Sequence, residues 1–326
     1  ETIQAGKYYR LVNAASKKTL YFDASGVMKS ADNVSKSATS VVKFENAETG
    51  RFHMKLEGKT FGKRVGNNQA ITLEADNSGN KGSYKVVQVG THFAFYDMVS
   101  NVSDRSYLHC NGSAANTLFA WDAGDINSPS RWFVIPATDV EIDMTDQGDK
   151  KYASAYLPFD VSNVAGATAY TGALNAEKNA IDMTATTAVP ANNGFVLVGT
   201  EDKATLTIGE AAAIEGNALT GTNTGIAFGD AAPKANYLVF GVNDGTVGFY
   251  TPGNVTAIPA NKAYINASAV SNGAISLNFG NTVTGINAAT LINGENNAPI
   301  YDLSGRRVWA PVKSGLYIQN GKKLVK

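Results

Sequence analysis

The first 140 residues contain a loose threefold repeat, and this repeat constrains the fold more than any other feature. Two independent markers recur at nearly the same spacing, 41 and 47 residues for the first marker and 42 and 46 residues for the second. The first marker lies at residues 18–20, 59–61 and 106–108, and the second at residues 43–44, 85–86 and 131–132. Repetition at such a period predicts three similar supersecondary units that pack on one another.

The pattern within each unit is that of short β-strands. Apolar runs are brief and are broken by turn residues about every 8–12 positions, with no helical periodicity, which is typical of all-β proteins. Three such units predict a β-trefoil over residues 1–140, a barrel closed by hairpins that leaves no sheet edge exposed. The buried strand expected at residues 107–110 includes the single cysteine, Cys110, as a small apolar side chain.

The third unit carries a family resemblance. Leu118-Phe119-Ala120-Trp121, followed by Ser130-Arg131-Trp132, resembles the ricin-type lectin family, whose repeats end in Gln-any-Trp. The resemblance implies that Trp132 packs in the barrel core and that Trp121 is the aromatic on which a sugar ring stacks. Asp122 would then accept hydrogen bonds from the sugar hydroxyls. The sequence departs from the family at Ser130, where the family has Gln, and no acidic residue near Leu108 matches the early acidic residue of the family's sugar site.

Residues 141–282 predict a second domain, an antiparallel β-sandwich. This domain contains two similar segments, Val189-Pro-Ala-Asn-Asn-Gly and Ile258-Pro-Ala-Asn-Lys-Ala. In each, the proline and asparagine predict a tight corner that leads into a strand. Asn243-Asp244-Gly245 stands between two apolar runs and predicts a hairpin. The whole segment is similar to a module common in Bacteroidota surface proteins, for which the resemblance implies no particular chemistry.

Residues 283–326 predict a small C-terminal β-meander of four strands. Ser304-Gly305 and Asn320-Gly321 each separate two short apolar runs, as hairpin turns do. Pairing outward from Asn320-Gly321 places Tyr317 opposite Leu324 and Leu316 opposite Val325. The order of the pieces, Ile-Tyr-Asp-Leu-Ser-Gly-Arg-Arg-Val and then Gly-Leu-Tyr-Ile-Gln-Asn-Gly-Lys-Lys, resembles the C-terminal sorting domain of the type IX secretion class of Bacteroidota. A terminal meander that only completes a neighbouring sheet is the alternative.

Charge is balanced overall but is uneven along the chain. Residues 1–140 carry 16 basic and 13 acidic groups, residues 141–282 carry 6 and 13, and residues 283–326 carry 6 and 2, which gives +3, −7 and +4. A basic tail beside an acidic middle domain favours docking between them. No basic patch is interleaved with aromatic residues, so nucleic acid is not an expected partner. No apolar run reaches ~18 residues, so the chain is not expected to span a membrane.

The sequence carries no motif of a catalytic, cofactor or metal site. His53, His92 and His109 are scattered, without the spacing of a zinc site or of a base held by a carboxylate. No phosphate-cradling loop or nucleophile motif is present, although the carboxylates of a glycosidase can come from distant strands and escape such a search. An enzyme is therefore less favoured than a binding protein, and no catalytic residue, cofactor or metal ligand is assigned.

Together these features predict a non-catalytic protein, secreted or on the outer cell surface, that recognises carbohydrate or glycoprotein through Trp121 and Asp122. The C-terminal segment would engage export machinery. Two alternatives stay open at this point. The trefoil could have lost its sugar sites and serve as a structural or protein-binding component, or the chain could be the C-terminal accessory part of a larger glycan-degrading enzyme.

Overall fold

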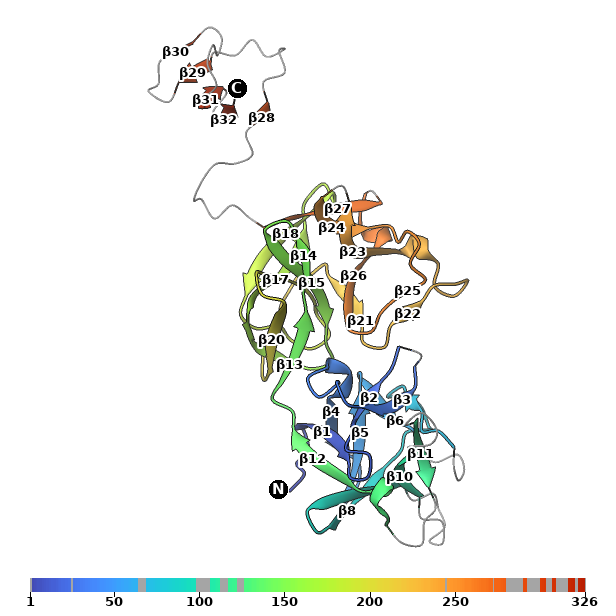
Figure 1. Cartoon of the computed structure of the whole chain (residues 1–326). Helices are drawn as coiled ribbons and strands as arrows, with labels where there is room; N and C mark the ends of the chain where they lie inside the picture. Colours follow the sequence, from blue (N-terminus) through green and yellow to red (C-terminus); the bar gives the residue numbers. More distant parts are fainter. Residues whose placement is uncertain are drawn as a thin grey trace. The chain divides into compact units, whose positions relative to one another are not determined.

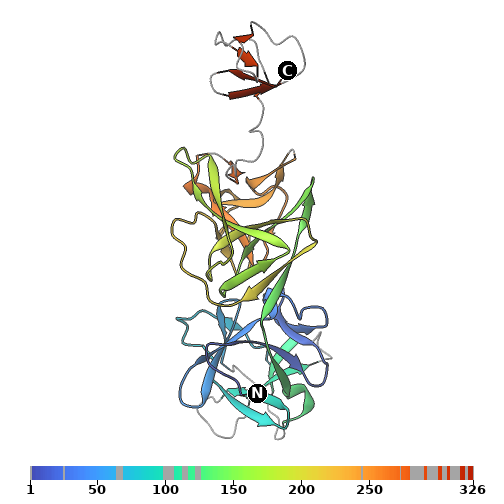
Figure 2. The ribbon, with the colours of Figure 1, turned by 90° about the vertical axis from the view of Figure 1, so that its left-hand side faces the viewer.

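The computed structural model contains β-strands and short 3-10 turns, and it divides into two compact units, 1–278 and 279–326. The structure describes residues 2–24, 26–63, 69–97, 106–111, 117–121, 126–243, 245–271, 273–279, 290–291, 300–302, 307–308, 316–319 and 322–325. Within the first unit, the strands up to residue 136 gather in one body and those from residue 139 onward in another (Figures 1 and 2). The all-β prediction is confirmed.

Twelve strands lie in the described residues of the first domain, and six of them close into a ring. Successive members pair as β1 with β4, β4 with β5, β5 with β8, β8 with β9, β9 with β12, and β12 with β1, all antiparallel. A closed ring has no free edge. The ring consists of β1 (Tyr8–Asn13), β4 (Val42–Asn46), β5 (Arg51–Leu56), β8 (Tyr84–Val89), β9 (His92–Asp97) and β12 (Trp132–Pro136).

The other six strands form three hairpins, one in each repeat. They are β2 (Thr19–Phe22) with β3 (Met28–Ala31), β6 (Lys59–Phe61) with β7 (Leu73–Glu74), and β10 (Ser106–Asn111) with β11 (Thr117–Trp121). A six-stranded barrel and three hairpins in threefold order constitute a β-trefoil. The first sequence marker falls on the second strand of every repeat and the second marker on the fourth strand, so the repeat prediction is confirmed.

One continuous apolar core fills the trefoil. Trp132 lies at its centre with 0% of its surface exposed, and its indole Nε1 donates a 3.0 Å hydrogen bond to the carbonyl oxygen of Leu108. Cys110 is buried, and its Sγ lies 3.1 Å from Ser30 Oγ. Both side chains therefore have the packing roles expected of them, because each fills the interior and satisfies its polar atom locally.

The second domain is built on a three-stranded sheet and a ten-stranded sheet. The first has the order β13-β20-β16, and the second the order β14-β15-β19-β17-β18-β27-β24-β23-β26-β21. The large sheet curls, because β15 also contacts β26 and β21 at the far end of the strand order. The strands are β13 (Asp139–Asp143), β14 (Thr145–Gln147), β15 (Lys150–Tyr156), β16 (Val161–Ala165), β17 (Ala167–Leu174), β18 (Ala180–Thr186), β19 (Gly194–Gly199), β20 (Lys203–Ile208), β21 (Thr220–Thr222), β23 (Tyr237–Asn243), β24 (Thr246–Tyr250), β26 (Lys262–Asn266) and β27 (Ala274–Asn278), with a separate pair β22 (Ile226–Ala227) and β25 (Ala257–Ile258).

The turns of the second domain lie at the positions predicted from the sequence. β23 and β24 pair through Asn243 opposite Thr246, which leaves a two-residue hairpin loop. Asn192 and Asn261, the matching residues of the two similar segments, both have φ of 58°, a left-handed conformation that asparagine tolerates. Each precedes its expected strand, β19 or β26. One pairing is not antiparallel, since β18 and β27 run side by side in the same direction.

The C-terminal unit contains a sheet with the order β28-β32-β31-β29-β30. Tyr317 pairs with Leu324 and Leu316 with Val325, as expected for the Asn320-Gly321 hairpin, whose two turn residues lie outside the described residues. The order differs from a simple meander, because β31 pairs with β29 and not with β30, and β28 pairs in parallel with β32. The strands are β28 (Thr290–Leu291), β29 (Ile300–Asp302), β30 (Arg307–Val308), β31 (Leu316–Gln319) and β32 (Lys322–Val325).

The boundaries drawn at 140/141 and 282/283 stay predictions. Strand β13 begins at Asp139 and pairs with β20 of the second domain, so the two sheets change over between Pro136 and Asp139. Among the described residues, no helix is both long enough and apolar enough to cross a lipid bilayer.

Candidate functional site

Trp121 is the last residue of β11, in the third repeat of the trefoil. Its register partner is Tyr107 of β10. Asp122 follows immediately and lies outside the described residues. The structure therefore gives the strand position of Trp121 and does not describe Asp122.

Trp121 ends a row of aromatic positions that crosses three neighbouring strands. Tyr107 is paired with Trp121 on one side and with Tyr96 of β9 on the other. The Tyr96 and Tyr107 rings meet edge to face with centroids 5.6 Å apart, and Lys85 Nζ lies 5.9 Å from the Tyr96 centroid. Residues directly opposite one another in antiparallel strands share a sheet face. Tyr96, Tyr107 and Trp121 thus occupy matched register positions on one face of the sheet, and we call them the aromatic row. The Tyr107 side chain in the middle of the row is buried, with 4% of its surface exposed.

No binding role was predicted from the sequence for Tyr96 or for Tyr107, which was placed only in the first marker and in an expected buried strand. Their position in the third repeat, together with Trp121, could have suggested that the three aromatic residues lie near one another. However, the two tyrosines are brought together by the pairing of barrel strand β9 with hairpin strand β10. Aligning the repeats with one another does not predict which residues of these two strands are opposite.

A fixed polar framework supports the hairpin that carries the row. His109 Nδ1 lies 2.9 Å from Ser130 Oγ, with both side chains buried, and burial lowers the pKa of the imidazole. Ser130 occupies the position at which the lectin family has glutamine, and here its hydroxyl contacts a histidine of β10. Together with the indole bond from Trp132 to Leu108, this contact ties β10 to the end of the repeat. Rigid support of this kind holds a binding face in one geometry.

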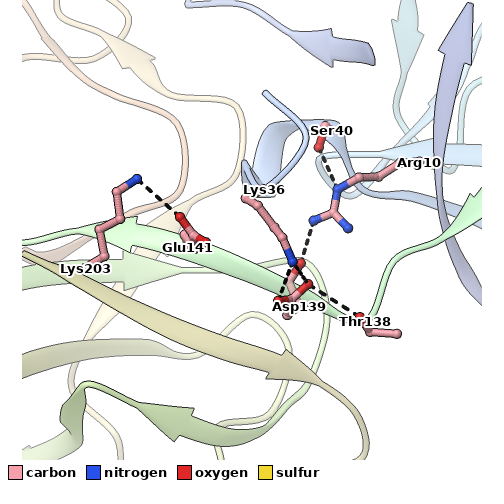
Figure 3. Close-up of polar contacts among 7 residues, drawn as sticks. All are labelled: Arg10, Lys36, Ser40, Thr138, Asp139, Glu141 and Lys203. Carbon is pink, nitrogen blue, oxygen red and sulfur yellow. Dashed lines mark hydrogen bonds and ion pairs between the residues drawn. The ribbon is translucent and has the colours of Figure 1, made fainter. Parts of the chain in front are cut away.

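A second candidate region lies where the trefoil meets the second domain. Figure 3 shows the polar contacts at this junction. Arg10 is buried, its Nε donates a 3.3 Å hydrogen bond to Ser40 Oγ, and its Nη2 donates to the carbonyl oxygen of Asp139. The Lys36 ammonium lies 2.6 Å from the Asp139 carboxylate, and Lys203 bonds Glu141 over 3.2 Å. Backbone hydrogen bonds from Ala137 to Tyr8 and from Glu141 to Lys36 add to this junction.

Two cavities lie beside the junction, and the wall of the larger is mostly apolar whereas that of the smaller is mostly polar. One encloses about 710 Å³ and the other about 330 Å³, and they share Tyr8, Lys43 and Asp160. The Tyr8 ring meets Phe159 edge to face at 5.8 Å, and burial raises the pKa of its hydroxyl. The Asp160 carboxylate accepts a 2.7 Å hydrogen bond from the backbone of Ala191. These charged groups are engaged with their neighbours, so the walls already have structural roles.

The smaller cavity is also lined by Glu57, a buried carboxyl. Only 2% of Glu57 is exposed, and burial raises its pKa to about 8, an effect that the hydrogen bond from Asn261 partly opposes. Asn261 Nδ2 donates to Glu57 Oε2 over 2.6 Å. Within the described part of the chain, Glu57 Oε1 and Asn223 Oδ1 are the buried side-chain atoms without a hydrogen-bond partner. A protonated carboxyl group can donate a hydrogen bond as well as accept one.

The described residues contain no group of three or more histidine, cysteine, aspartate or glutamate side chains placed to hold a metal ion. His53 Nδ1 bonds the carbonyl oxygen of Gly82, and His92 packs on Phe133 with ring centroids 4.2 Å apart. The three histidines are therefore engaged locally and far apart in the trefoil sequence.

Comparison with known proteins finds no matching family model and no matching curated sequence. Solved structures resemble part of the chain. A ricin B-like lectin of Macrolepiota procera in complex with lactose is 9% identical, with a TM-score of 0.36, and the match covers 42% of this chain and 100% of that one. SeviL bound to asialo-GM1 saccharide is 12% identical, with a TM-score of 0.33 and 40% and 98% covered. A designed threefold-symmetric protein, ThreeFoil, is 12% identical, with a TM-score of 0.34 and 40% and 99% covered. The trefoil assignment itself rests on the closed ring of strands.

Proposed function

We propose that this chain is a non-catalytic binding protein that recognises carbohydrate or glycoprotein through its trefoil, at the aromatic row ending in Trp121. The observation that carries the proposal is the register of Tyr96, Tyr107 and Trp121 on the adjacent strands β9, β10 and β11. Aromatic faces are platforms for the apolar face of a sugar ring. Asp122, next along the chain, would accept hydrogen bonds from the hydroxyls at the ring's edge.

Binding at one such site would be weak. A shallow surface platform buries little of the ligand, and the lost freedom of the ligand offsets much of the stacking energy. The preferred ligand would therefore be displayed in many copies, as on a glycoprotein or a cell-surface glycan, since multiple attachment raises the overall affinity without any new contact.

The same proposal places the protein outside the cell or on its outer surface. It is supported by the resemblance of the C-terminal segment to type IX sorting domains of Bacteroidota and by the paired strands around Asn320-Gly321 and Ser304-Gly305. The segment would engage export machinery, and the second domain would separate the trefoil from it.

A protein-binding role for the trefoil is the second candidate. Ser130 favours it, because the hydroxyl at the family's glutamine position is buried against His109, and no acidic residue near Leu108 completes the family's sugar site. A trefoil of this kind would present its surface to another protein and show no response to free glycans.

A glycan array probed with the full chain separates the two candidates. The carbohydrate proposal predicts selective retention on a related set of glycans and competition by the matching free oligosaccharide. Retention on no glycan, combined with saturable binding to a deglycosylated protein partner, contradicts it and supports the second candidate.

A further inference from the structure

A separate pocket opens in the second domain, in the seam of the curled ten-stranded sheet. It encloses about 440 Å³ and lies between the β14–β15 hairpin and the group formed by β23, β24, β25 and β26. This volume is within the ~300–1,000 Å³ usual for small-molecule sites, which often occupy the mouths of curled or closed sheets. None of the residues proposed above to bind glycan lines this pocket.

Most of the pocket wall is apolar. Val239, Val242, Val247, Val255 and Ile258 contribute to the lining. Val242 and Val255 are also among the four large hydrophobic side chains that stand out as exposed in the described residues, at 42% and 48%. An exposed apolar patch beside an apolar cavity marks a surface that gains free energy when a ligand covers it.

A lysine lies among these apolar residues, and the polar residues Asp143, Thr145, Gln147 and Ser154 also line the pocket. Lys262 of β26 lines the pocket, and burial lowers the pKa of its ammonium group, an effect that the charge of Asp143 partly opposes. No hydrogen bond or ion pair of the Lys262 side chain is found among the described residues. Asp143 is instead held by Lys203 at 3.2 Å.

The other lysines with shifted pKa values show the opposite behaviour. Hydrogen-bonded carboxylates raise the pKa of each, as Asp23 does for Lys29 and Glu45 for Lys43. The Lys262 side chain is partly buried, and its Nζ is not among the buried unpaired atoms, so it keeps some contact with solvent. An anion bound in this apolar pocket would replace that solvent and pair the charge. The combination of an apolar wall and one unpaired cation selects a ligand with an apolar body and a single anionic end.

We propose that this pocket binds an amphipathic carboxylate of the medium-chain fatty acid type, with the carboxylate paired to Lys262 and the hydrocarbon chain against Val239, Val247 and Val255. The site is independent of the glycan proposal. An uncharged ligand of the same length would fill the wall equally but leave Lys262 unpaired.

Calorimetric titration of the full chain with decanoate and with decanol tests this assignment. We expect decanoate to bind at least about tenfold more tightly than decanol, a difference of 1.4 kcal/mol. In Lys262→Met, a side chain of similar length without charge, the two ligands should bind with equal affinity. Lys150→Met is the matched control, because it removes an exposed lysine of β15 that is outside the pocket lining, and it should keep the preference.

A second variant guards against a folding defect in Lys262→Met. Val255→Asp places a negative charge at an exposed position on the rim and should weaken decanoate binding about tenfold while leaving the melting temperature of the unliganded chain unchanged. The proposal is overturned if the wild type binds neither ligand, if it binds both equally, if Lys262→Met retains the preference, or if Val255→Asp binds decanoate as the wild type does.

Discussion

The side-chain amide of Asn261 donates a 2.6 Å hydrogen bond to the carboxyl group of Glu57, joining the second domain to the trefoil across 204 residues of sequence. Glu57 is 2% exposed and Asn261 is 7% exposed. Glu57 stands at the tip of the β5–β6 hairpin, and both residues have positive φ, 53° and 58°. Because burial raises the pKa of Glu57 to about 8, the junction contains a carboxyl group that is largely protonated at neutral pH.

This pairing predicts a pH-dependent stability that Glu57→Gln removes. The folded pKa lies above the ordinary value of 4.5, so the folded state holds the proton more tightly than the unfolded chain. The free energy of unfolding should therefore fall as pH rises from about 4.5 to about 8, by up to about 5 kcal/mol relative to the variant, and level off above that range. Glutamine keeps the acceptor for Asn261 and supplies a permanent N–H donor.

Urea unfolding of both proteins at pH 5, 7 and 9 measures this difference. Four charged neighbours in the same cavity do not titrate in the window, because ion pairing lowers the pKa of Glu45 and Asp76 and raises that of Lys43 and Lys55. Unfolding free energies that run parallel with pH in the wild type and in Glu57→Gln would show that Glu57 is not the titrating group.

Two cations at the junction should differ sharply in their contribution. Arg10 is buried and bonds Ser40 and the Asp139 carbonyl, so Arg10→Ala leaves buried acceptors unpaired and should cost about 2–3 kcal/mol of unfolding free energy. Lys36→Ala removes an exposed ion pair with Asp139 and should cost less than about 1 kcal/mol. Denaturant unfolding of the two variants compares them, and an equal cost for both would contradict this view of the junction.

Trp132 should matter for stability and not for ligand binding. Trp132→Phe removes the indole N–H that pairs with the Leu108 carbonyl and leaves a small cavity in the trefoil core, at a cost of roughly 2–4 kcal/mol. Thermal unfolding measures the loss, and glycan affinity below the transition should match the wild type. A variant that melts normally but no longer binds glycan would place Trp132 in the binding site.

The sequence predicted the trefoil well because its markers recur on equivalent strands. Residues 18–20, 59–61 and 106–108 mark the second strand of each repeat, and Trp132 fills the core as the family resemblance implies. The hairpins around residues 244–245 and 320–321 were equally legible, because asparagine, aspartate and glycine report directly on turn geometry.

Features that depend on contacts between distant segments were not visible in the sequence. Glu57 looks like an ordinary charged turn residue until Asn261, from the second Pro-Ala-Asn corner, is placed against it, and its burial raises its pKa. The pairing of β29 with β31 was likewise not visible, because the sequence does not show which strand pairs with the second edge of β29. The Tyr96–Tyr107 contact could be predicted only with the register of β9 and β10 in hand. Lys262 could be recognised as a candidate binding residue only once the pocket that it lines was known.

The C-terminal segment should be required for export. Deleting residues 283–326 should retain the protein inside a Bacteroidota host, as measured by fractionation of culture medium and cells. The net charges of +4 and −7 in the tail and the second domain further lead us to expect a lower melting temperature for the truncated chain. An unchanged melting temperature would leave the tail as a sorting label alone, and normal export would overturn its assigned role.

The central claim is that the trefoil binds glycan at Trp121, and calorimetric titration of Trp121→Ala tests it most directly. The titrant is the oligosaccharide that the array selects, and Trp132→Phe is the control for a trefoil that is weakened but still folded. We expect Trp121→Ala to reduce affinity at least about tenfold, because stacking on the indole is lost, while thermal unfolding remains close to that of the wild type. An affinity unchanged in Trp121→Ala would contradict the claim.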